Sequence, residues 1–166
     1  GYDASYKLTS EIRTGTHPYS IAYTYDNVGN RLTQTKDGVL TNYAYNNRDQ
    51  LTAESSPLNA ISYVYDHAGR MTNKTDNAGA TNYTWIDNDR MAQVSGPGVL
   101  ATYEYDAAGQ RVSETSGAAT KKYLIDYQLP YGQVIAETDN SGNLVAGYVY
   151  GLERISQSRG GNVHFY

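Results

Sequence analysis

Aromatic residues recur along this chain with a strict period of twenty residues. Five positions in this register carry a ring, and another ring lies two residues before each of them. The earlier rings of the pairs are Tyr23, Tyr43, Tyr63, Tyr83 and Tyr103, and the later rings are Tyr25, Tyr45, Tyr65, Trp85 and Tyr105. A period of this length is typical of repeat proteins, in which each unit packs only against its neighbours. The pattern therefore predicts a function that resides in an assembled surface and not in a single pocket.

Large residues occupy every second position around the ring pairs, as in residues 21–25, 61–65 and 101–105. Successive side chains of a β-strand point to opposite faces, so this alternation places both rings of a pair on one face of a strand. Glycine or an Asn/Asp pair recurs within each ten residues, which argues against helices.

A turn is predicted directly after each ring pair. Asp at the first position and Gly at the fourth are typical of a type I turn, because the Asp side chain accepts hydrogen bonds from turn amides and Gly adopts positive φ. These turn residues are Asp26 with Gly29, Asp66 with Gly69, and Asp106 with Gly109. In the two intervening repeats, Asp49 and Asp89 occupy the glycine position, which superposes a forty-residue period on the shorter one.

A second set of turn signals lies about ten residues further along each repeat, and this spacing without helices indicates an antiparallel meander. We predict an all-β fold: a continuous antiparallel strip of about seven or eight β-hairpins, or roughly fourteen to sixteen short strands. Because strands twist with a fixed hand, a strip of this length is expected to coil. Residues 1–117 are expected to form regular repeats and residues 118–166 divergent ones, in one continuous structural unit. The turn pattern breaks at residues 129–132.

Composition narrows the classes of function. Tyrosine is the main apolar material, with 18 Tyr against one Phe, one Trp and two Met in 166 residues. A net charge of −4, with basic residues spread singly, argues against nucleic acid as a partner. No run approaches 18 apolar residues, so no membrane span is predicted. The absence of cysteine leaves the compartment open.

The recurring carboxylates Asp26, Asp66 and Asp106 are predicted to cap turns. Calcium needs about six to eight convergent oxygens, and one Asp in each hairpin does not supply them.

The histidines His17, His67 and His164 share no zinc-ligand spacing, and no serine lies in a nucleophile elbow. We therefore predict no catalytic, metal or cofactor-binding residues, and that the chain is not an enzyme.

The ring ladder allows two interpretations. The tyrosines either pack on one another as cross-strand pairs that line the strip, or present faces on which sugar rings stack. Packing is favoured because few aliphatic residues are available, and carbohydrate binding is the alternative function.

The motif Tyr65-Asp66-His67-Ala68-Gly69-Arg70-Met71 resembles the repeat unit of the YD-repeat or Rhs-repeat family, which includes the C components of Tc toxins. Residues 123–156 are similar to the stretch that leads into the Rhs-associated core. The resemblance implies an arc of a hollow shell that encapsulates a C-terminal toxin or effector. It also implies a secreted or bacterial cell-surface protein, whose partners are the rest of its own shell and the enclosed polypeptide. Both ends are expected to continue into a longer protein.

In many bacterial members of this family, the core that follows the repeats releases the enclosed segment by aspartyl self-cleavage. The completing motifs are expected beyond Tyr166, so no residue of this chain is assigned that role. Self-processing remains a third hypothesis. Self-association through open sheet edges, near residues 2–8 or 163–166, is expected of an isolated arc.

Overall fold

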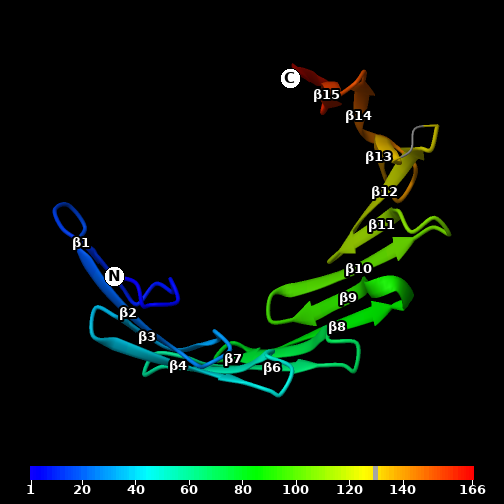
Figure 1. Cartoon of the computed structure of the whole chain (residues 1–166). Coiled ribbons are helices and arrows are strands. Elements are labelled where there is room, and N and C mark those ends of the chain that lie inside the picture. The colour runs from blue at the N-terminus through cyan, green and yellow to red at the C-terminus, as the bar shows by residue number, and fades with distance from the viewer. Residues whose placement is uncertain (129–130) are drawn as a thin grey trace. The chain divides into compact units, whose positions relative to one another are not determined.

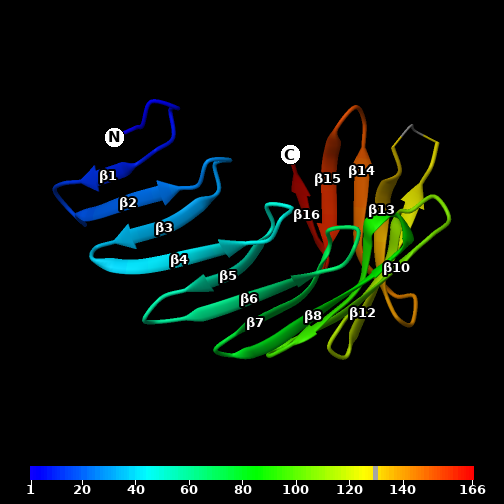
Figure 2. The same ribbon diagram turned by 60° about the horizontal axis from the view of Figure 1, so that its bottom comes forward.

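A computed structural model describes residues 1–128 and 131–166 of the chain. Sixteen β-strands form within these residues, and their order in the sheet follows the chain from β1 to β16 (Figures 1 and 2). No α-helix occurs in the described part of the chain, and a short 3₁₀ turn at Asp87–Asp89 interrupts the strands. The predicted all-β antiparallel strip of hairpins is therefore confirmed.

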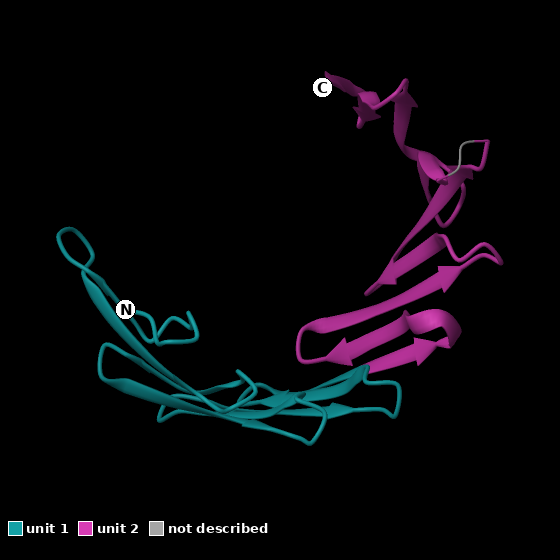
Figure 3. Cartoon of the chain, in the orientation of Figure 1, with its two compact units in different colours: residues 1–82 teal, residues 83–166 magenta. Residues whose placement is uncertain are grey.

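The chain divides into two compact units, Gly1–Asn82 and Tyr83–Tyr166 (Figure 3). The strands of the first unit are β1 (Ser10–Arg13), β2 (Tyr19–Tyr25), β3 (Arg31–Lys36), β4 (Val39–Tyr45), β5 (Leu51–Ser55), β6 (Ala60–Tyr65), β7 (Met71–Asp76) and the start of β8 (Gly79–Ile86). The predicted boundary between residues 117 and 118 separates regular from divergent sequence and stays a prediction. Of the predicted pattern break at residues 129–132, residues 129 and 130 lie outside the described residues.

The second unit is built of consecutive β-hairpins in the same way as the first. Its strands are the end of β8, then β9 (Arg90–Gly96), β10 (Val99–Tyr105), β11 (Arg111–Ser116), β12 (Ala119–Asp126), β13 (Gln133–Asp139), β14 (Leu144–Tyr150), β15 (Arg154–Arg159) and β16 (Asn162–Phe165). From β9 to β16 each strand pairs antiparallel with the next along the chain. Short loops of this kind bring only sequence neighbours together, as expected of a repeat architecture.

A β-bulge precedes the later ring of the repeats. In the β2–β3 pair, Thr24 lies opposite Thr33 while Tyr25 lies opposite Arg31, so one residue of β3 is left over. The same register shift recurs before Tyr45, Tyr65, Tyr105 and Tyr150. Bulges bend a strand and increase its local twist.

The interior is unusually thin. Among the described residues, the buried apolar side chains are Ala101 and Ala146, and none of the large side chains is fully buried. The rings are half-buried, so each unit is stabilised by partial burial of many tyrosines.

No helix among these residues has the length and apolar character that a membrane crossing requires.

Candidate functional site

The rings of each pair lie on one face of their strand. In β2 the residues at alternate positions, among them Tyr23 and Tyr25, are half-buried while those between them are exposed. The centroids of these two rings are 6.5 Å apart, with planes tilted by 33°. The same alternation places the ring pairs of β4, β6, β8 and β10 at half-buried positions. We call the face that carries the pairs the ring face.

The hydroxyl of the later ring donates a hydrogen bond to a backbone carbonyl where the preceding strand begins. Tyr65 donates to the carbonyl oxygen of Leu51 at 2.9 Å. The equivalent bonds join Tyr25 to Leu8 at 2.7 Å, Tyr45 to Arg31 at 3.0 Å, Tyr105 to Met91 at 3.0 Å and Tyr150 to Val134 at 3.0 Å. A half-buried phenol needs such a partner, so the bond explains why tyrosine and not phenylalanine fills this position. Trp85 occupies it in the fourth repeat.

For Tyr43, Tyr63 and Tyr123, the hydroxyl instead reaches a carboxylate or amide oxygen on the preceding strand. Tyr63 donates to Oε1 of Glu54 at 2.6 Å, and Tyr43 approaches Oε1 of Gln34 at 3.4 Å. In the second unit, Tyr123 donates to Oε2 of Glu114 at 3.0 Å. Burial, and then the bond to Glu114, raises the pKa of the Tyr123 hydroxyl to about 12. In these three cases the acceptor lies nine residues before the tyrosine, and this spacing is visible in the sequence.

Arginine side chains lie against the ring faces. The guanidinium carbon of Arg31 is 5.8 Å from the ring centroid of Tyr23 and 4.4 Å from that of Tyr43. The second unit repeats the arrangement, with Arg111 at 5.3 Å from Tyr103 and 5.6 Å from Tyr123. At these two positions, a cation–π contact takes the place that the sequence prediction gave to direct ring-on-ring pairs.

The aspartates after the ring pairs cap their turns. The Oδ1 atom of Asp26 accepts hydrogen bonds from the amides of Val28, Gly29 and Asn30 at 2.8–3.1 Å. Asp66 accepts the amide of Arg70 at 2.9 Å, and its Oδ2 atom accepts Nε of the same residue at 2.7 Å. These bonds from Arg70 lower the pKa of the Asp66 carboxyl.

The fourth position of these turns has positive φ, whether glycine or aspartate fills it. In the third turn, Asp106 accepts the amide of Gln110 at 2.9 Å, and the Tyr127 hydroxyl also donates to its carboxylate. The φ angles are 105° at Gly29, 88° at Gly69, 83° at Gly109, 58° at Asp49 and 58° at Asp89. Glycine adopts this conformation at the lowest cost, and Asp and Asn tolerate it best among the other residues.

Side chains also bridge successive turns, which the sequence analysis did not anticipate. Asn30 donates to Oδ1 of Asp49 at 2.9 Å, and Gln50 donates to the carbonyl of Gly69 at 3.2 Å. In the second unit, a Cβ atom at Gly109 would lie only 1.6 Å from Nη2 of Arg90. The bridging residue and the turn position it reaches are nineteen residues apart in each case.

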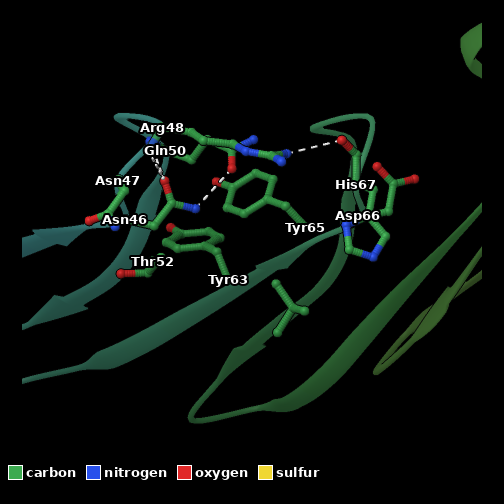
Figure 4. Close-up of a pocket in the computed structure, with 10 residues that line it drawn as sticks. Asn46, Asn47, Arg48, Gln50, Thr52, Tyr63, Tyr65, Asp66 and His67 are labelled. Carbon is green, nitrogen blue, oxygen red and sulfur yellow. Dashed lines mark hydrogen bonds between the residues drawn. The ribbon is translucent and has the colours of Figure 1, made fainter.

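An open hollow of about 600 Å³ lies beside the ring pair of β6 in the first unit (Figure 4). The rings of Tyr63 and Tyr65 line it, together with the turn at residues 46–50 and with His67 from the next turn. Arg48 spans it, donating from Nη1 to the carbonyl of His67 at 3.0 Å. Its volume is within the range of about 300–1,000 Å³ that ligand pockets show, although most such pockets are more enclosed and apolar.

The second unit contains a buried carboxylate that has no counterpart among the other residues that the structure describes. Glu137 is only 7% exposed, and it accepts the hydroxyl of Tyr148 at 2.5 Å and Nη2 of Arg159 at 2.9 Å. Lys121 Nζ lies 3.8 Å from the same carboxylate. Burial alone raises the pKa of Glu137, but the bonds from Tyr148 and Arg159 outweigh it and lower the pKa overall. Residues from four successive strands therefore meet at one charge.

Within the described residues, no three His, Cys, Asp or Glu side chains come together in a way that could hold a metal ion. His17, His67 and His164 are all exposed. The ring face thus offers aromatic faces, guanidinium groups and internally bonded hydroxyls.

The RHS Repeat family model matches residues 45–81, which include the ring pair of β6 and its Asp66 turn. This segment is an RHS repeat. The resemblance drawn from the Tyr65–Met71 motif is thereby confirmed, and the RHS segment is a structural repeat whose hydroxyls and turn carboxylate are bonded within the sheet.

Solved structures support the fold. A chain in the crystal structure of TcdB2-TccC3-TEV superposes with a TM-score of 0.71 at 18% identity, over 96% of this chain and 11% of that chain. A chain in the crystal structure of TcdB2-TccC3 gives a TM-score of 0.66 at 18% identity, over 88% of this chain and 10% of that one. The present chain thus spans about a tenth of the length of the solved chains. No curated protein matches it.

Proposed function

We propose that this chain is a non-catalytic wall segment of a hollow RHS shell, and that the shell encloses a C-terminal toxin or effector polypeptide in the full-length protein. The observation that carries the proposal is the strand order, in which each hairpin continues the last and no α-helix occurs among the described residues. Such a strip extends by adding repeats, as a wall requires. The RHS repeat match and the fold shared with chains of TcdB2-TccC3 add support.

The remaining family expectations belong to the same proposal. Residues 1–117 are the regular part of the wall and residues 118–166 the divergent part that leads toward an Rhs-associated core, within one continuous structural unit. The partners are the rest of the shell and the enclosed polypeptide. The protein acts outside the cell, either secreted or on the bacterial surface.

A structural role agrees with how the polar groups are used. The carboxylates of Asp26, Asp66 and Asp106 accept turn amides, and the hydroxyls of Tyr63 and Tyr65 are bonded internally. Each of these groups therefore already has a structural partner in a turn or on a neighbouring strand. The purified chain is expected to keep its full mass on storage, and truncation at a fixed site would favour the self-processing hypothesis.

Carbohydrate binding is the alternative function, and the open hollow beside Tyr63 and Tyr65 is the feature that favours it. The internal bonding of both hydroxyls favours packing instead. Glycan-array binding by the purified chain, lost on Tyr65→Ala and Tyr105→Ala, would support the alternative.

The shell proposal is tested by limited proteolysis of the full-length protein. We expect the C-terminal segment to resist cleavage while the wall is intact, and to be cut rapidly when Gly109→Val disrupts a wall turn. Gly117→Val is the matched control, because it carries the same kind of backbone strain at φ of 58° while its Cβ atom meets nothing within 4 Å. Cleavage of the enclosed segment at the same rate in the wild type and both variants would contradict encapsulation.

A further inference from the structure

Arg31 carries a charge that no described residue balances. It begins β3 on the ring face of the first unit, with its guanidinium carbon between the rings of Tyr23 and Tyr43. Its Nε atom is buried and has no hydrogen-bond partner. No ion pair or side-chain hydrogen bond from this guanidinium occurs within residues 1–128 and 131–166. Removing a cation partly from water without a partner raises the free energy of the folded protein, and an anion that pairs with the cation lowers it again.

Arg111 supplies the internal comparison. It occupies the equivalent position at the start of β11, opposite Tyr105 as Arg31 lies opposite Tyr25. Nη1 of Arg111 lies 3.7 Å from Oε2 of Glu114, three residues further along the strand. The residue three positions after Arg31 is Gln34, whose side chain is neutral. The first unit therefore has the ring-flanked guanidinium without the carboxylate.

We propose that Arg31, flanked by Tyr23 and Tyr43, binds a carboxylate group supplied from outside the repeat. A guanidinium matches a carboxylate in shape and donates two parallel hydrogen bonds to it. The two rings hold the guanidinium, so little side-chain freedom remains to be lost on binding. The nearby acid Glu54 accepts the hydroxyl of Tyr63 and is held on the far side of Tyr43, which lies opposite it in the sheet.

The ligand class is a carboxylate, from an acidic segment of a polypeptide or from a small organic acid. The inference does not depend on the shell function, because it concerns one guanidinium and its two rings. If the shell function also holds, the enclosed polypeptide supplies the acidic residue.

The test follows the Nε–Hε signal of Arg31 by NMR during titration with two probes at equal carboxylate concentration. The probes are a capped tetraglutamate peptide and sodium acetate, with a capped tetralysine peptide as the charge-reversed control. We expect both carboxylate probes to shift the Arg31 signal and tetralysine to leave it unchanged. Tighter binding of the peptide assigns the site to a polypeptide, whereas equal affinities per carboxylate assign it to a small acid.

Two reciprocal substitutions separate this site from general charge attraction. Gln34→Glu installs the carboxylate that Arg111 already has, and is expected to weaken tetraglutamate binding at Arg31 by about fivefold, the upper range for a partly exposed ion pair. Glu114→Gln removes that carboxylate from Arg111 and is expected to make its Nε–Hε signal respond to the probes. The glutamine oxygen still accepts the hydroxyl of Tyr123, which keeps the fold.

Circular dichroism verifies that each variant stays folded. No shift of the Arg31 signal with either carboxylate probe, or equal affinity in the wild type and Gln34→Glu, would overturn the proposal.

Discussion

The hydroxyl of Tyr65 donates a 2.9 Å hydrogen bond to the backbone carbonyl of Leu51, fourteen residues earlier in the chain. Tyr45 and Arg31 have the same spacing and the same bond. Each bond ties the end of one strand to the start of the strand before it, next to the bulge. The repeats are thus joined on the ring face by phenol groups that supply both apolar area and a specific polar contact.

The side chain of Arg90 bridges two turns, so substitution is expected to destabilise the protein more at Gly109 than at Gly98. Gly109→Ala adds a Cβ atom 1.6 Å from Nη2 of Arg90 at φ of 83°, so Arg90 must leave its place 5.8 Å above the ring of Tyr105. Gly98→Ala is strained at φ of 71° but meets nothing within 4 Å. Both lose about 1–2 kcal/mol from the backbone. We expect a lower melting temperature for Gly109→Ala, and equal melting temperatures would exclude the bridge.

High pH is expected to lower the free energy of unfolding as the half-buried tyrosine hydroxyls of the ring face ionise. Burial and the bond to Glu54 raise the pKa of the Tyr63 hydroxyl, and similar causes raise that of Tyr123 to about 12. Tyrosine in an unfolded chain titrates near pH ~10. The stabilisation is therefore complete below about pH 10 and is lost as pH rises through the folded pKa. Absorbance at the tyrosinate band should show a group that titrates above the value for tyrosine in an unfolded chain, and a single step at about pH 10 would contradict this.

The Glu137 cluster is expected to stabilise the second unit. Glu137→Gln leaves Arg159 and Lys121 without their carboxylate, and we expect a loss of about 2 kcal/mol, below the range for fully buried pairs because both cations are partly exposed. Glu104→Gln, at an exposed position, is the matched control. Denaturant unfolding measures both, and equal stabilities would contradict the assignment.

Acid provides a second test of the same cluster. The pKa of Glu137 is lowered in the folded state, so its contribution is present above the unfolded value of about 4.3 and is lost as pH falls through the folded pKa. The difference between the wild type and Glu137→Gln should therefore shrink in strong acid. A difference that stays constant down to the lowest pH would show that ionisation of Glu137 plays no part.

The open edge of β16 is expected to promote self-association of the 166-residue chain. The amide of Tyr166 bonds to the carbonyl of Ile155, so alternation directs the amide of Phe165 to the open side. Phe165→Pro removes that donor and leaves the bonds to β15 intact, whereas His164→Pro breaks one of them. Light scattering should show association that Phe165→Pro reduces. A monodisperse monomer at high concentration would contradict the expectation.

Alternation of large residues was enough to predict that Tyr63 and Tyr65 share a face, because a strand has only two faces. The turn at Asp66 and Gly69 could be predicted in the same way, because its first position needs a side-chain acceptor and its fourth position needs positive φ. Both inferences involve neighbours in sequence, where the backbone dictates geometry.

Longer-range features were not predicted, for identifiable reasons. The bulge before Tyr65 depends on how two strands pair, and the alternation of residues within one strand does not predict it. The place of Arg31 between two rings depends on cross-strand distances. The Glu137 cluster joins residues that lie 11–22 positions apart without a repeating pattern. The acceptors Gln34, Glu54 and Glu114, each nine residues before a tyrosine, could have been found in the sequence by their shared spacing.

The central claim is that tyrosine hydroxyls on the ring face join successive strands, and unfolding of Tyr65→Phe tests it most directly. The substitution keeps the ring and removes only the bond to Leu51. Tyr6→Phe is the matched control, because Tyr6 is 90% exposed. In urea unfolding, we predict that Tyr65→Phe lowers the free energy of unfolding by about 1 kcal/mol and that Tyr6→Phe leaves it unchanged. Equal stability of Tyr65→Phe and the wild type would contradict the claim.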